Sequence, residues 1–148
     1  RGIAVPKSTA TCNSILALVF NATAWADIAQ NDGSSPLTNL YLSLHTASPG
    51  IGNAQTTNEC AYTNYARIPV VRTTSGWEVP LGGSTSNAAL EQFAQCGVTG
   101  ANITHVAIGT ASSGAGTVLY QGALSSPLSV ANGIQPQFAA NALTVTET

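Results

Sequence analysis

Two histidines and six acidic side chains are the groups in this sequence that could carry out acid–base chemistry. His45 and His105 would each need a nearby nucleophile and a carboxylate to form a hydrolase site. His45 falls at the solvent-facing end of an expected strand, and the chain has no Gly-x-Ser-x-Gly turn to present a nucleophilic serine. We therefore expect no catalytic residues and no enzymatic activity.

The glycine-rich stretch at 109–116 has the composition of a phosphate-binding loop, but it contains no lysine and no helical pattern follows it. We expect a turn between strands there, and no bound cofactor. Acidic residues are too scattered for an oxygen-rich metal site, so the sequence predicts no metal ligands within one copy. Three cysteines match no zinc or redox spacing and are expected to be reduced thiols: Cys12, Cys60 and Cys96.

Aromatic side chains could form a binding platform if they were exposed, because they bring a large contact area at low entropic cost. Tyr62 and Tyr65 lie where a long irregular segment, 46–63, ends, and we take them as interface candidates. Trp25 is a third candidate, since it lies on the apolar stripe of an expected helix that would complete contacts between subunits.

That helix is expected over about residues 10–30, where apolar side chains recur at helical spacing. Ser8 or Thr9 can cap its start, and the segment 31–36 (NDGSSP) is a dense stop signal, so the helix should end near Gln30. Residues 1–9 contain few apolar anchors and are expected to form an N-terminal arm.

Beyond the helix, the apolar period changes from about 3.6 to 2, which is typical of half-buried strands. Short strands are expected at 40–45, 65–72, 76–81, 88–93, 103–109, 118–124, 128–130, 137–139 and 143–146. Their spacing predicts a mainly β fold, an antiparallel β-sandwich or jelly-roll-like domain with one N-terminal α-helix. No linker divides the chain, so residues 10–148 are expected to form a single β-rich domain.

Charged residues make up only 7% of the chain, against roughly 25% in ordinary soluble domains. Neutral polar groups can be buried at contacts more cheaply than charges, which suits a protein packed among many copies. The net charge is −2 and no basic patch exists, so nucleic-acid binding is not expected. The longest apolar run is too short to span a membrane, and the chain is expected to be soluble.

Several blocks of the sequence resemble a family of small tailed-bacteriophage virion proteins. The blocks are 39–50 (NLYLSLHTASPG), 56–59 (TTNE), 62–67 (YTNYAR), 104–111 (THVAIGTA), 114–116 (GAG) and 119–124 (LYQGAL). Members are tail-fibre-like or head-decoration-like structural proteins. The resemblance therefore implies a virion component without catalytic residues, assembled in the cytoplasm of the bacterial host.

From the small size, the neutral surface and the N-terminal arm we expect a capsid decoration or cement protein that stabilises the head lattice. Its partners would be other copies, in a homotrimer, and the major capsid protein or another virion protein. One alternative is a tail or tail-fibre-associated structural protein, although a fibre shaft would show a sequence period and none is found. A distant alternative is a small secreted hydrolase or carbohydrate-binding domain.

Overall fold

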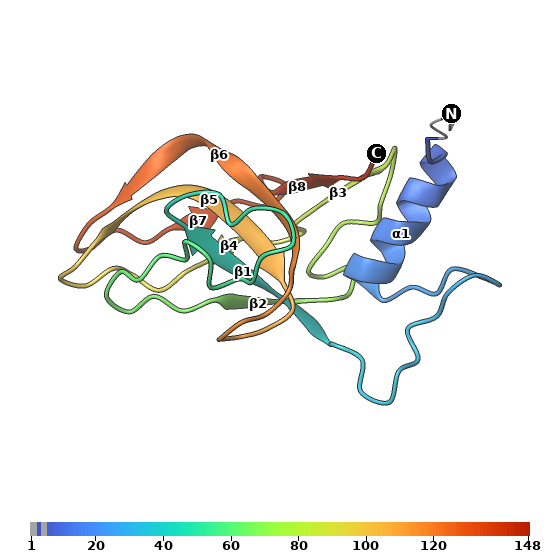
Figure 1. The fold of residues 1–148 in the computed structure, drawn as a ribbon, viewed down its shortest axis with the longest axis horizontal. Helices are drawn as coiled ribbons and strands as arrows, with labels where there is room; N and C mark the ends of the chain where they lie inside the picture. Colours follow the sequence, from blue (N-terminus) through green and yellow to red (C-terminus); the bar gives the residue numbers. More distant parts are fainter. Residues whose placement is uncertain (1–2, 4–5) are drawn as a thin grey trace. The chain divides into compact units, whose positions relative to one another are not determined.

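A computed structural model describes residue 3 and residues 6–148 of the chain. The described chain is mainly β, with antiparallel sheets and one N-terminal helix, which confirms the predicted fold class (Figure 1). The elements are α1 (Thr9–Asn21), β1 (Asn39–His45), β2 (Ile68–Val71), β3 (Ser84–Ser86), β4 (Glu91–Gln92), β5 (Ala101–Gly109), β6 (Val118–Val130), β7 (Gln137–Phe138) and β8 (Thr144–Thr146). Residues 1, 2, 4 and 5 of the expected arm lie outside the described residues.

Contacts group the chain into two compact units, each assembled from separate segments. Unit 1 comprises residues 1–38, 71–89 and 139–148, and unit 2 comprises residues 39–70 and 90–138. Among the described residues, no helix has the length and apolarity that crossing a membrane requires.

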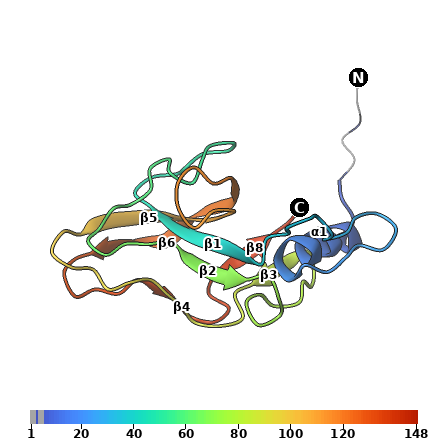
Figure 2. The ribbon, with the colours of Figure 1, turned by 90° about the horizontal axis from the view of Figure 1, so that it is seen from below.

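In unit 1, α1 packs its apolar stripe into a small core. Ser8 caps the helix by accepting a hydrogen bond from the Thr11 backbone, and the stripe repeats every four residues (Cys12, Leu16, Phe20). Phe20 meets the buried Trp77 edge to face, with ring centroids 4.6 Å apart. Figure 2 shows α1 beside the segment that carries β3, the strand paired antiparallel with β8.

The helix ends at Asn21, so the predicted end near Gln30 is wrong. Ala22 takes the left-handed conformation (φ 52°), and the Ala22 and Thr23 backbone N–H groups both donate to the carbonyl of Ala17. Trp25 and Ala29, which the spacing assigned to the helical stripe, exchange backbone hydrogen bonds across a tight turn. A four-residue apolar spacing fits such a turn as well as it fits a helix.

In unit 2, a four-stranded sheet has the order β2-β1-β5-β6, with β5 antiparallel to both β1 and β6. A separate two-stranded ribbon joins β4 to β7. The core consists mainly of aliphatic side chains from β1 and β5 and of aromatic side chains from the loops: Leu40, Leu42, Leu44, Ile103, Val106, Ile108, Tyr62 and Phe93.

Two predicted strand assignments are wrong. Residues 76–81 do not form a continuous strand. The Gly76 and Trp77 N–H groups bond back to the Thr73 carbonyl, only isolated bridges occur at Trp77 and Leu81, and the strand of this region is the polar β3. Strands expected at 118–124 and 128–130 are one strand, β6, which continues through Pro127. An edge strand tolerates proline, since it needs hydrogen-bond donors toward one neighbour only.

Candidate functional site

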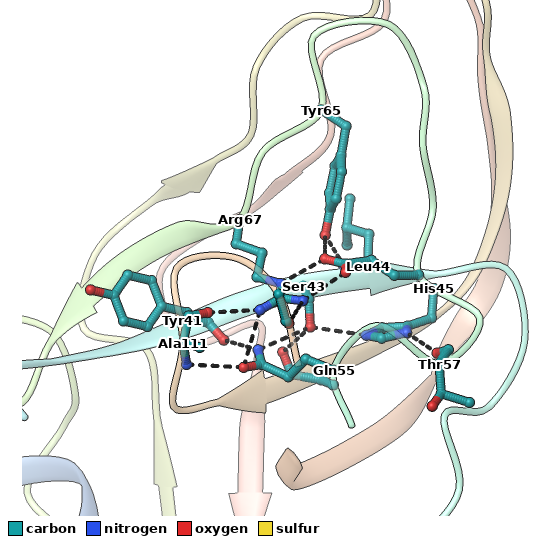
Figure 3. Close-up of polar contacts among 12 residues, drawn as sticks. Tyr41, Ser43, Leu44, His45, Gln55, Thr57, Tyr65, Arg67 and Ala111 are labelled. Atoms are coloured by element: carbon teal, nitrogen blue, oxygen red, sulfur yellow. Dashed lines mark hydrogen bonds and ion pairs between the residues drawn. The ribbon is translucent and has the colours of Figure 1, made fainter. Parts of the chain in front are cut away.

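Ser43 and His45 lie on the same face of β1, where the sequence predicted a solvent-facing histidine. Ser43 Oγ is 2.9 Å from His45 Nε2, and His45 Nδ1 is 2.9 Å from the Thr57 carbonyl (Figure 3). Because that carbonyl can only accept, Nδ1 carries the proton and Nε2 accepts from the serine hydroxyl. The pair has the contact of a serine–histidine dyad, but both residues are fully buried and a backbone carbonyl stands where a hydrolase has a carboxylate.

The expectation of an exposed His45 is therefore wrong, and the long loop 46–63 is the reason. The loop returns alongside the end of β1: Cys60 N–H donates to the Leu44 carbonyl and Thr46 N–H donates to the Asn58 carbonyl. This covers a face that simple alternation assigns to solvent. Burial lowers the pKa of His45, which favours the neutral imidazole that the hydrogen bonds require.

Gln55 connects this loop to the turn after β5. Its Oε1 accepts from the Ala111 N–H at 3.0 Å, its backbone N–H donates to Gly116 at 2.8 Å, and its side chain is fully buried. Gly109 and Gly116 leave the space that the side chain fills, because a Cβ on either glycine would collide with the Gln55 amide. The glycine-rich stretch thus forms a turn between strands, as predicted, and it encloses a glutamine.

Arg67 and Glu59 form a two-point ion pair, with Nε to Oε1 and Nη2 to Oε2 both at 2.7 Å. The Arg67 side chain is only 3% exposed. Its remaining donors reach the carbonyls of Ala111 at 2.9 Å and Gly114 at 2.7 Å. The hydrogen bond from Arg67 to Glu59 raises the pKa of the guanidinium, so Arg67 is a permanent cation that joins the long loop to the 110–117 turn.

Tyr65 completes the network and meets one of the other interface candidates. Its hydroxyl donates to Glu59 at 2.8 Å and accepts from the Leu44 N–H at 3.1 Å, and burial raises the pKa of the phenol. Its ring lies 5.3 Å from the ring of Tyr62, which is 2% exposed and donates to the Ala94 carbonyl. Trp25 is half-buried and lies in unit 1, whereas both tyrosines lie in unit 2. Roles at an interface remain a prediction for all three residues.

A cleft of about 440 Å³ opens over this network in unit 2. It is lined by residues 59–62, 64–67 and 112–114. Its most buried polar groups, those of Glu59, Tyr65 and Arg67, already bond to one another and to the backbone. The arrangement is therefore suited to fixing the shape of two loops.

Residues that could hold a metal ion do not gather anywhere in the described part of the chain. The three cysteines are free and buried, and burial raises the pKa of Cys60 to about 12, so its thiol is unreactive at neutral pH.

Sequence reasoning missed Gln55, Glu59 and Arg67 as a connected set. One signal was present: in a chain with only four basic residues, an arginine inside an apolar strand has to be paired or exposed. Nothing in the local sequence indicates that its partners lie on two different loops, because those contacts depend on the sheet register that brings β1 beside β5.

Comparison with known protein families gives a match that spans nearly the whole chain. The family described as Podophage GP4 fiber I protein gp80 matches residues 6–146, a range that contains the entire polar network. No curated protein matches the chain. The resemblance to small phage virion proteins is thereby confirmed, and the chain belongs to the Podophage GP4 fiber I protein gp80 family of phage structural proteins.

Proposed function

We propose that this protein is a structural component of a phage tail fibre. The observation that carries the proposal is the family match over residues 6–146. The matched family is described as one of fibre proteins. This favours the alternative drawn from the sequence over capsid decoration, the function that composition favoured.

Within a fibre, the chain would be a folded module rather than part of a shaft. Its sequence has no repeat, and its strands form short antiparallel sheets. Buried anchors such as Arg67, Gln55 and His45 hold the long loop in one conformation, which suits a part that presents a fixed surface to neighbouring proteins. The serine–histidine pair is enclosed by protein, so the proposed role is packing and binding without catalysis.

Immunogold labelling of intact phage particles with an antibody against this chain tests the placement directly. We expect gold at the tail fibres, with an antibody against the major capsid protein labelling the heads as the control. Gold distributed over the head lattice would contradict the fibre assignment and restore capsid decoration. Particles that remain unlabelled after mild disruption, while the capsid control labels, would contradict a place in the virion.

A further inference from the structure

The two edges of the sheet in unit 2 are built very differently. β2 forms one edge with only four residues, and it contains Pro69. Short length and proline are two of the features by which proteins prevent an edge strand from pairing with another chain. The β2 edge is therefore protected.

The opposite edge, β6, lacks most of these features. It is the longest strand, with 13 residues, and Figure 1 shows it along the outer side of its sheet. Its proline, Pro127, lies near one end, so the segment 118–126 is free of proline. Residues 92–146 contain no aspartate, glutamate, lysine or arginine, so β6 itself carries no fixed charge. Half of the backbone N–H and C=O groups of an antiparallel strand point away from any one neighbouring strand. Because β6 is an edge strand, these N–H and C=O groups point outward from the sheet.

The side chains of β6 are also incompletely covered. Leu119 is 38% exposed, Gln121 and Ala123 are exposed on one face of the strand, and Val118 and Leu124 are only half-buried. A strand added beside β6 would give each of these side chains a cross-strand neighbour. Gly122, in the middle of this segment, has open space around its Cβ position.

We propose that β6 is a self-association surface, and that two copies of this chain pair β6 against β6 in antiparallel orientation near Gly122. Identical strands paired in this way are related by a two-fold axis, so a single contact closes both open edges at once. The pairing brings no charges together, because neither strand carries any, and both strands have the same length. This proposal replaces the expected homotrimer with a dimer, and it does not depend on where in the virion the protein lies.

Sedimentation equilibrium of the purified full chain tests the proposal with charge variants. Pairing near Gly122 places Gln121 of one copy opposite Ala123 of the other, so the double variant Q121K/A123K sets like charges against each other. We expect a dimer for the wild type and at least tenfold weaker association for Q121K/A123K. The variant T74K/A115K adds the same two charges at exposed sites outside β6 and should dimerise as the wild type does.

A second double variant, in which glutamate replaces the introduced lysines, provides the decisive test. Q121E/A123E should also dissociate, and an equal mixture of the glutamate and lysine variants should recover the dimer. Far-UV circular dichroism and the unfolding midpoint verify that each variant is folded. In the wild type itself, amide exchange along β6 should slow as protein concentration rises, a readout that needs no variant. A monomeric wild type would overturn the proposal, as would a dimer or trimer that tolerates lysines on β6, or a monomer whose β6 captures a strand of another virion protein.

Discussion

Two ion pairs of this chain differ in burial, and they should differ in how much each contributes to the free energy of unfolding. Arg67 and Glu59 have side chains that are 3% and 15% exposed, whereas Lys7 and Glu147 are 37% and 19% exposed. Arg67→Ala leaves the Glu59 carboxylate partly buried without its cation and two loop carbonyls without their donor. We expect it to lower the free energy of unfolding by about 3–5 kcal/mol, measured by chemical denaturation.

Lys7→Ala is the matched control, because it breaks the exposed pair. Its cost should stay below about 1 kcal/mol, since solvent screens that interaction and the side chains are free to move. If the two variants cost the same, the Arg67 network does not contribute to stability as described.

His45 should make the stability of the protein depend on pH. Burial lowers its pKa from the usual 6.5, so the unfolded chain binds a proton more readily than the folded one. The contribution to stability is fully present above 6.5 and is lost as the pH falls through the lowered folded value. We expect the free energy of unfolding, measured by denaturation between about pH 5 and pH 8, to fall on acidification. A His45→Gln variant with an unchanged pH slope would contradict this assignment.

The same residue marks the limit of what the sequence could predict about the site. Leu42 and Leu44 alternate with Ser43 and His45, and that pattern correctly predicts a strand with one apolar face. It also assigns the polar face to solvent, which is wrong, because the return of loop 46–63 buries both faces of the end of β1. A local pattern carries no information about a loop that folds back over it.

At the scale of the elements, the C-terminus of α1 offers a test of backbone strain. Ala22 adopts φ 52° and ψ 26°, a left-handed conformation that costs an L-residue more than glycine. Ala22→Gly should therefore raise the free energy of unfolding by about 0.5–1 kcal/mol, measured by chemical denaturation. Ala17→Gly places the same substitution inside the helix and should lower it by about 1 kcal/mol. Loss of stability in both variants would show that the αL cap does not set the end of the helix.

The core strands with apolar alternation were predictable in their bounds, whereas β3, which has none, was not predicted. β1 and β5 lie close to their predicted bounds, because they supply the core of unit 2 and their sequences show it. β3 consists of Ser84, Thr85 and Ser86, has no apolar residue, and is a strand because it pairs with β8. Arg72 is a further case, since its guanidinium caps the end of α1 by donating to the carbonyls of Leu18 and Val19, a long-range contact.

At the scale of the whole molecule, the path of the chain should couple the two units. The chain passes between unit 1 and unit 2 four times, so the three segments of unit 1 are joined by the two segments of unit 2. If unit 2 unfolded alone, those joining segments would become flexible loops of roughly 30 and 50 residues. Closing such loops costs on the order of 3–4 kcal/mol each, and this cost would lower the stability of a unit 1 that stayed folded. We therefore expect both units to unfold in one transition.

The distribution of aromatic residues makes this coupling measurable without labels. Both tryptophans, Trp25 and Trp77, lie in unit 1, and the four tyrosines, Tyr41, Tyr62, Tyr65 and Tyr120, lie in unit 2. Denaturation followed by selectively excited tryptophan fluorescence and by tyrosine absorbance should give coincident midpoints. Arg67→Ala is a destabilising substitution in unit 2. It should shift the tryptophan midpoint, which reports on unit 1, by as much as the tyrosine midpoint, which reports on unit 2. If the tryptophan transition stayed in place while the tyrosine transition moved, the units would fold independently, and loop closure would not link them.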